Sequence, residues 1–123
     1  MSKIQALKRE ALSEASASPG ITRYMAFKDK DSIVLRSQAE PGTISGWHHH
    51  GGHEVYGYVV SGTVRLENGS EKENTISIGP GDFLHVPPHT IHREINPSSD
   101  EENDVILFLR GDGELVVNVD KPD

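Results

Sequence analysis

Cysteine is absent from the 123 residues of this chain. Its absence excludes disulfide frameworks, thiolate zinc sites, iron–sulfur clusters and cysteine nucleophiles, so any metal ion must be held by nitrogen and oxygen ligands. A chain without cysteine also fits a reducing compartment. We therefore expect a cytoplasmic protein.

Long apolar runs and clustered positive charge are also lacking. The opening sequence MSKIQALKRE has no apolar centre of the kind a signal peptide carries, and no later run approaches the ~20 apolar residues that span a bilayer. The net charge of −7 has no compensating block of Lys and Arg. Since phosphate-rich surfaces attract basic proteins, we expect neither nucleic acid nor a membrane as partner.

The length of the chain indicates one domain. Residues 2–16 are rich in Ala, Leu, Glu and Lys, and their apolar positions are spaced like one face of a helix. Ser18-Pro19-Gly20 then stops this pattern. The sequence therefore predicts a helical N-terminal extension over residues 1–20 and an all-β domain over residues 21–123.

Ten short strands are predicted in the second segment. Runs of Val, Ile, Tyr, Phe and Thr alternate there with clusters of Gly, Pro, Asn and Asp. Turn sequences such as Asn68-Gly69 and Gly79-Pro80-Gly81 separate the runs. This pattern indicates a closed barrel or a sandwich. The expected strands are residues 21–27, 32–39, 43–50, 55–60, 63–67, 75–78, 82–86, 91–96, 104–110 and 114–119.

All seven histidines lie between positions 48 and 92. Side chains at i and i+2 share one face of a strand, so His48 and His50 can converge on one point while His49 faces the other way. Imidazole is the commonest metal ligand in proteins, and a pair on one strand needs further ligands brought by the fold. The alternative is an exposed polar strand that binds nickel adventitiously. A second cluster favours the metal site: His85, His89 and His92.

The two clusters resemble the two sequence motifs of the cupin superfamily, which are small barrels with a double-stranded β-helix fold. The first motif reads Gly, five residues, His-x-His, three or four residues, Glu, six residues, Gly. The second reads Gly, five residues, Pro-x-Gly, two residues, His, three residues, Asn. The first motif is matched here by His48, His50, Glu54 and Gly62, with no upstream glycine at the right offset. The second is matched by Gly81, Pro87, His92 and Asn96, with His89 in place of the second glycine.

The resemblance implies a single-domain, RmlC-like monocupin of the type-2 conserved barrel kind. Its fold would be an all-β, double-stranded β-helix (jelly-roll) barrel, preceded here by the short N-terminal helix. The resemblance also implies that His48, His50 and His92 bind one divalent metal ion inside the barrel. Iron, manganese, nickel and zinc all remain open as the metal.

The fourth ligand is open between Glu54 and His53. Gly62 lies one residue further from Glu54 than the six-residue spacing of the motif allows. Counting back six residues from Gly62 leads to Val55, which cannot bind a metal. If a bulge near Gly57 absorbs the extra residue, Glu54 points inward; if the register of Val55 holds, His53 points inward instead. We expect Glu54 as the ligand and keep His53 as the alternative.

A divalent ion with open coordination positions suits Lewis-acid or oxygen chemistry. We therefore expect a metal-dependent enzyme that acts on a small organic molecule, with a dioxygenase favoured and an isomerase as another option. The alternative is a non-catalytic cupin that binds or senses a small molecule or a metal. No catalytic residue separate from the metal ligands is evident. Because cupins commonly associate and sheet edges need covering, we also expect a homodimer.

Overall fold

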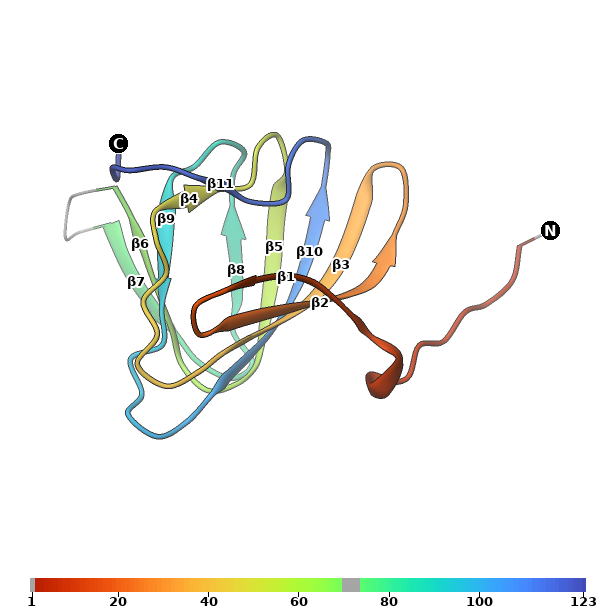
Figure 1. Cartoon of the computed structure of the whole chain (residues 1–123), viewed down its shortest axis with the longest axis horizontal. Coiled ribbons are helices and arrows are strands. Elements are labelled where there is room, and N and C mark those ends of the chain that lie inside the picture. Colours follow the sequence, from red (N-terminus) through yellow and green to blue (C-terminus); the bar gives the residue numbers. More distant parts are fainter. Residues whose placement is uncertain (1, 70–73) are drawn as a thin grey trace.

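Two antiparallel sheets form the chain, of which the computed structural model describes residues 2–69 and 74–123. The six-stranded sheet has the order β1-β2-β3-β10-β5-β8, and the five-stranded sheet has the order β11-β4-β9-β6-β7. The sheets curl around a shared interior (Figure 1). The strands are β1 (Ser13–Ser18), β2 (Ile21–Lys28), β3 (Ser32–Ala39), β4 (His48–His49), β5 (Glu54–Ser61), β6 (Val64–Asn68), β7 (Thr75–Ile78), β8 (Phe83–Val86), β9 (His92–Ile95), β10 (Asn103–Arg110) and β11 (Val117–Asn118).

The all-β prediction is confirmed, and each of the ten expected strands is present. Two of them are much shorter than expected: β4 covers only His48–His49 and β11 only Val117–Asn118. These two short strands pair with each other, and β4 pairs on its other side with β9. The histidine-rich segment is therefore held between two neighbours although little of it is regular strand.

The prediction of an N-terminal helix is wrong. Helical structure in the described residues near this end is a single 3-10 turn, η1 (Arg9–Ala11), after which β1 pairs antiparallel with β2. A short isolated helix is marginal in water unless it packs an apolar face. The serine-rich segment 13–18 is stabilised instead by backbone hydrogen bonds along the edge of β2.

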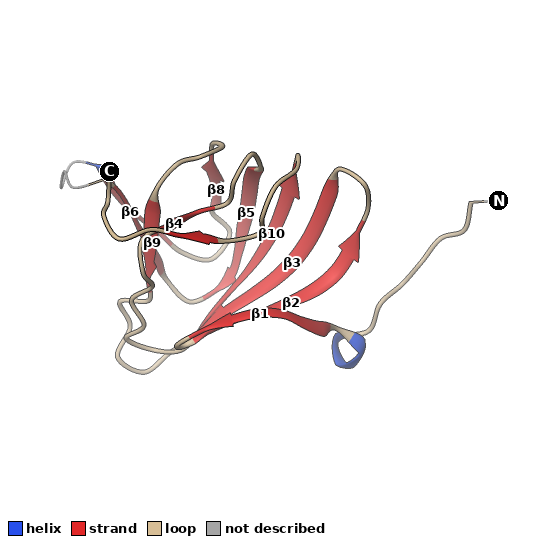
Figure 2. Ribbon diagram, turned by 45° about the horizontal axis from the view of Figure 1, so that its top comes forward, coloured by secondary structure: helices blue, strands red, loops and turns tan. Residues whose placement is uncertain are grey.

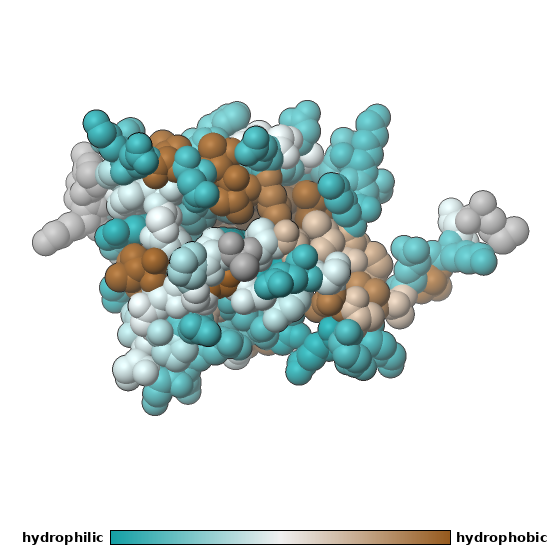
Figure 3. All heavy atoms as spheres, in the orientation of Figure 1, coloured by the Kyte–Doolittle hydropathy of each residue, from teal (hydrophilic) through white to brown (hydrophobic). Residues whose placement is uncertain are grey.

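The residues before the turn leave the barrel as an extended, exposed arm (Figure 2). Ile4 on this arm is fully exposed. In Figure 3, polar side chains cover most of the visible face, and the apolar ones gather in smaller areas between them. No helix among the described residues is long and apolar enough to cross a membrane.

The core lies between the sheets and follows the alternation of each strand. On β5, Val55 and Val59 are buried, whereas Tyr56 and Tyr58 on the opposite face are 40% exposed. This alternation also places Glu54 on the outer face. The buried apolar cluster consists of Leu35, Val55, Val59, Val64, Leu66, Val86, Val105, Leu107 and Leu109.

Two motif positions act through their backbone conformation. Gly62 has a φ of 79°, and a Cβ there would lie 2.7 Å from the Cα of Asn103 on the neighbouring strand. Only glycine fits both demands. His89 stands where the motif has a glycine, and among the described residues it is the one non-glycine with positive φ, at 56°. Histidine tolerates this left-handed conformation better than most residues do.

Asn96, the last motif position, joins the end of β3 to the loop that follows β9. Its side chain is 1% exposed. The amide nitrogen donates hydrogen bonds to the carbonyl oxygens of Ala39, Glu40 and Glu101, at 3.0, 3.2 and 2.8 Å. The amide oxygen accepts one from the backbone N–H of Ser98 at 3.1 Å. The residue therefore has a structural role at the end of the barrel.

Candidate metal centre

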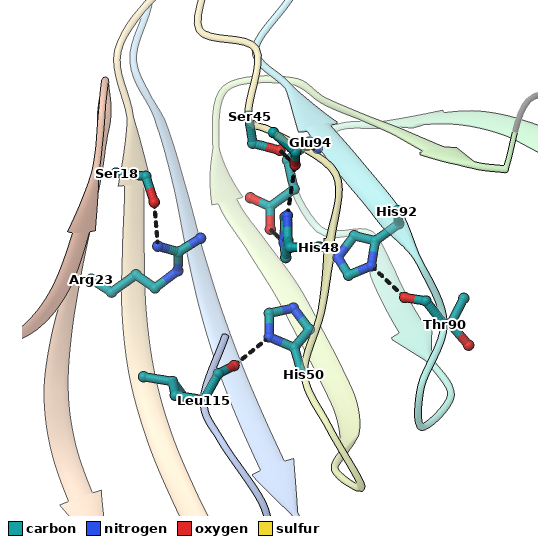
Figure 4. A network of polar contacts seen from close by, with 10 residues as sticks. Ser18, Arg23, Ser45, His48, His50, Thr90, His92, Glu94 and Leu115 are labelled. Atoms are coloured by element: carbon teal, nitrogen blue, oxygen red, sulfur yellow. Dashed lines mark hydrogen bonds and ion pairs between the residues drawn. The ribbon is translucent and has the colours of Figure 1, made fainter. Parts of the chain in front are cut away.

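Three histidines converge on one point inside the barrel. His48 on β4 is the register partner of His92 on β9, and His50 follows two residues after His48 on the same face. Their ring centroids are 4.4 Å apart for His48 and His92, and 5.1 Å apart for each of the other two pairs. All three side chains are buried. Figure 4 shows the rings facing one another between the two sheets.

Glu94 completes the group. It follows His92 by two residues on β9, so both side chains face the interior. One ligand atom from each of His48, His50, His92 and Glu94 lies within 4.8 Å of the others. Ligands that lie about 2.1 Å from a tetrahedral ion are about 3.4 Å from one another. A contraction of the group would therefore bring all four atoms onto one ion.

Backbone carbonyl groups fix the tautomer of each ring. The Nδ1 atom of His48 lies 2.9 Å from the oxygen of Gly46, that of His50 2.7 Å from Leu115, and that of His92 2.9 Å from Thr90. A carbonyl oxygen only accepts, so each Nδ1 must carry the hydrogen. Each Nε2 is then left with a free lone pair. In metal-binding histidines, a hydrogen bond from one ring nitrogen to a carbonyl or carboxylate commonly orients the ring so that the other nitrogen faces the metal.

The Nε2 atom of His48 is left unsatisfied. It is buried and has no hydrogen-bond partner among the described residues. Its nearest acidic neighbour, the Oε1 atom of Glu94, is 3.7 Å away, which is too long for a hydrogen bond. An unsatisfied buried polar atom costs about 1–3 kcal/mol. Since a cation would supply the missing partner, the residues present fit a metal ion.

Electrostatics favours neutral rings for His50 and His92 and an anionic Glu94. Burial lowers the pKa of His50 to about 4, and burial together with the neighbouring His48 lowers the pKa of His92. Burial alone would raise the pKa of Glu94. Contact with His48 and the positive charge of Arg23 outweigh this effect and hold the pKa of that carboxyl well below its usual range. Neutral imidazoles beside a carboxylate are a typical donor set for a divalent transition metal.

The structure places the two other predicted ligands outside this group. Glu54 lies on the outer face of β5, where its Oε2 atom is 2.5 Å from Nε2 of His85. The pairing of β5 with β10 runs without a shift from Glu54 to Val59, and that with β8 from Val55 to Tyr58, so the expected bulge near Gly57 is not formed. A shift occurs further along, between Val59 and Ser61, and leaves Glu54 on the outer face. The register of Val55 therefore holds.

His53 points inward, as that register requires, but it does not join the group. It is 2% exposed. Its Nδ1 atom donates to the carbonyl oxygen of His50 at 2.7 Å, and its backbone N–H donates to the same oxygen at 3.2 Å. His53 therefore closes the turn between β4 and β5. The carboxylate of the group comes instead from Glu94. The only signal for it in the sequence is its spacing of two residues from His92, which places both side chains on the same face of a strand.

Two spaces adjoin the group. An enclosed cavity of about 20 Å³ is lined by Val55, His50, His92 and Glu94 together with mostly apolar residues. This is room for little more than one water-sized group. A wider groove of about 310 Å³ runs past β8 to His92 and contains Leu66, Asn68, Asn74, Ile76, His85, Val86, Pro87 and Thr90. His92 therefore borders both the interior and an open groove.

A two-sheet β-barrel with a histidine-rich cluster facing its interior defines a cupin-type barrel with a candidate metal site. The chain belongs to the Cupin domain family, whose sequence model matches residues 35–109. None of the curated protein sequences matches this chain significantly. The family assignment confirms the resemblance seen in the sequence motifs.

Solved structures support the same fold. KdgF from Halomonas sp. is 22% identical with a TM-score of 0.73, over 90% of this chain and 96% of that one. An RmlC-like cupin from Shewanella frigidimarina is 20% identical with a TM-score of 0.73, over 91% and 95%. A deletion mutant of oxalate decarboxylase OxdC from Bacillus subtilis is 23% identical with a TM-score of 0.73, and 87% of this chain covers 30% of that longer chain. At these identities the likeness establishes the double-stranded β-helix fold.

Proposed function

We propose that this chain is a metal-dependent cupin that binds one divalent cation and acts on a small organic molecule. The ligands are His48, His50, His92 and Glu94. The observation that carries the proposal is the shared tautomer of the three histidines: every Nδ1 donates to a backbone carbonyl, and every Nε2 is left free. Such a set of lone pairs beside a carboxylate has no evident use in a purely structural core.

A similar barrel gives independent support for a divalent ion. A structure of Bacillus subtilis oxalate decarboxylase, 23% identical to this chain, is described by its Mn(II) centres. A barrel of this fold is therefore compatible with such an ion.

The donor set determines how the metal could work. Four protein ligands fill a tetrahedral zinc site but leave two positions open on a six-coordinate manganese, iron or nickel ion. Open positions supply Lewis acidity and, with iron, oxygen chemistry. Around the site, the apolar side chains of Leu84, Val86 and Leu107 line the enclosed cavity and limit the entry of water. We favour oxygenase-type chemistry on this basis.

A second candidate is binding without catalysis. Of the described residues that line the enclosed cavity, the only titratable ones are His50, His92 and Glu94, all of them members of the metal group. A general acid or base separate from the ligands is therefore missing from the cavity wall. A protein that binds or senses a small molecule through its metal needs no such residue.

Metal content tests the proposal. Untagged protein prepared without chelators is compared by elemental analysis with a His48→Ala/His50→Ala/His92→Ala variant. A His49→Ala/His89→Ala variant, which removes two histidines outside the group, is the matched control. We expect one equivalent of metal in the wild type and the control, and none in the triple variant. A wild type that takes up no manganese, iron, nickel or zinc on reconstitution would overturn the proposal.

Turnover separates the two candidates. The metal-loaded protein is incubated with panels of phenols, diketones, thiols, sugars and small organic acids while oxygen and product are followed. Product formation that the triple variant lacks supports the enzyme. A ligand that binds the loaded protein and is recovered unchanged supports the non-catalytic alternative.

A further inference from the structure

Arg23 carries a buried positive charge with few partners. It lies on the inward face of β2 and is 2% exposed. Its Nη1 atom donates to the hydroxyl of Ser18 across 3.4 Å, a long hydrogen bond. Guanidinium has five N–H donors, and buried charges are normally paired and fully hydrogen-bonded. Among the described residues no carboxylate lies within ion-pair distance of Arg23. The guanidinium can therefore donate several hydrogen bonds to an anion, and the fold uses few of these donors.

The guanidinium points at the candidate metal centre. In Figure 4 it extends from β2 across the interior toward His50 and Glu94. Its charge contributes to holding the pKa of Glu94 low, which places the two groups within electrostatic reach. Another buried acid, Asp104, is not available, because Arg36 binds both of its oxygens, at 2.9 and 2.5 Å.

A polar residue that lines the enclosed cavity is paired with Arg23. Ser37 on β3 is the register partner of Arg23, and it lines the enclosed cavity together with His50, His92 and Glu94. A hydroxyl that lines the cavity and a cationic fork at the paired position of the neighbouring strand are usual elements of a carboxylate site. The cavity has room for little more than one water-sized group, so of a small organic anion it could take the carboxylate end alone, with the remaining atoms directed to the groove that His92 also borders.

The charge balance changes when a metal binds. Without metal, the positive Arg23 and the negative Glu94 cancel. A divalent ion with three neutral imidazoles raises the sum to a net charge of about +2 in an interior of low dielectric constant. Uncompensated buried charge is strongly unfavourable. Metal loading therefore creates a demand for an anion between the ion and Arg23.

We propose that Arg23 is an anion-binding residue and that the ligand of the metal site is a small carboxylate of a few carbons. The carboxylate group lies between Arg23 and the cation. This inference rests on the proposed metal site and names the class of molecule that the site takes. It has a thermodynamic consequence, because two ligands that compensate each other's charge must tighten each other's binding by the same factor.

A metal titration tests this coupling. Mn²⁺ is titrated into metal-free protein by calorimetry, alone and with acetate or pyruvate, and with acetamide as the neutral control. We expect either carboxylate to tighten Mn²⁺ binding by about tenfold, and acetamide to have no effect. In Arg23→Met, Mn²⁺ alone should bind more tightly than in the wild type, because a like charge is gone, and carboxylates should have little effect.

Two further variants make the result specific. Arg23→Lys keeps the charge and should keep part of the coupling, although it loses the planar fork. Arg65→Met removes a half-buried arginine from β6, in the other sheet, and should behave as the wild type. Thermal unfolding of each variant checks that it is folded.

The outcomes separate this inference from the proposed function. Wild type that binds Mn²⁺ with an affinity unchanged by acetate and pyruvate overturns the carboxylate site but leaves the metal site intact. Coupling that persists unchanged in folded Arg23→Met also overturns it, and shows that Arg23 only balances Glu94. Wild type that binds no metal ion overturns the proposed function, and this inference with it.

Discussion

Val55 on β5 and Glu94 on β9 line the same interior cavity from opposite sheets. The first cupin motif carries its acidic residue on the segment after His-x-His, and in this chain the register gives that inward position to Val55. The carboxylate comes instead from the strand that carries His92. The barrel therefore has two positions from which a side chain faces the cavity that His50 and His92 line.

This relationship predicts a rescue. Glu94→Gln removes the anionic ligand without changing the shape of the side chain, and we expect metal affinity to fall by about 100-fold or more. Adding Val55→Glu to this variant should recover much of the loss, because the new carboxylate enters the same cavity. Affinity is measured by calorimetric titration with Mn²⁺. Glu54→Gln, on the outer face, is the control and should bind as the wild type. Unchanged affinity in Glu94→Gln would contradict the assignment.

The stability of the metal-free protein should fall with acid. The pKa of His50 is about 4 in the folded chain against an ordinary 6.5, so below pH 6.5 the unfolded chain takes up a proton that the folded chain does not. Between pH 6.5 and 4 this proton alone lowers the free energy of unfolding by about 3 kcal/mol. The lowered pKa of Glu94 acts in the same direction below its ordinary pKa.

Urea unfolding at pH 7 and pH 4.5 measures this loss. In His50→Gln the ring that titrates is absent, so the difference between the two pH values should shrink. A metal-free wild type that is equally stable at both would show that His50 titrates normally in the folded chain.

Asn96 should matter for stability alone. Asn96→Ala leaves three backbone carbonyls without their shared donor, and we expect a loss of about 3 kcal/mol in the free energy of unfolding. Metal stoichiometry in the remaining folded protein should be unchanged, because Asn96 is not a member of the metal group. Asn118→Ala, at an exposed position on β11, is the control and should change little.

The N-terminal arm and β1 should differ in importance. Residues 2–8 are exposed, so their deletion should change the free energy of unfolding by less than about 0.5 kcal/mol. Deletion of residues 2–18 also removes β1 and uncovers the edge of β2, which should lower stability and promote self-association. Thermal unfolding and size-exclusion chromatography measure both effects. Equal behaviour of the two deletions would show that β1 is dispensable.

The sequence predicts much of this architecture because strand periodicity is a local property. Ten strands follow from alternation and turn residues, and the convergence of His48 and His50 follows from their spacing. His92 depends on the second motif, since nothing local says that β9 lies beside β4. The spacing of Glu94 to His92 puts both on one face of a strand, but the first motif carries its acidic residue after His-x-His, where Glu54 stands.

The two errors have a common physical cause. The register of β5 and the fate of residues 2–16 are both decided by neighbouring strands rather than by local composition. Pairing of β5 with β8 and β10 holds Val55 inward and so turns Glu54 outward. Pairing with β2 makes a strand of a segment whose composition favours a helix. Such competition between local propensity and tertiary contacts is invisible in a single sequence.

The carbonyl groups of Gly46, Thr90 and Leu115, which orient the three rings, belong to the main chain. No substitution at these positions can delete a carbonyl oxygen. Changes of their side chains therefore leave the imidazoles in the same orientation, as long as the backbone keeps its path. The cavity wall can therefore be redesigned for new ligands while the three imidazoles keep their orientation. A barrel of this kind is a robust starting point for divergent evolution and for engineering alike.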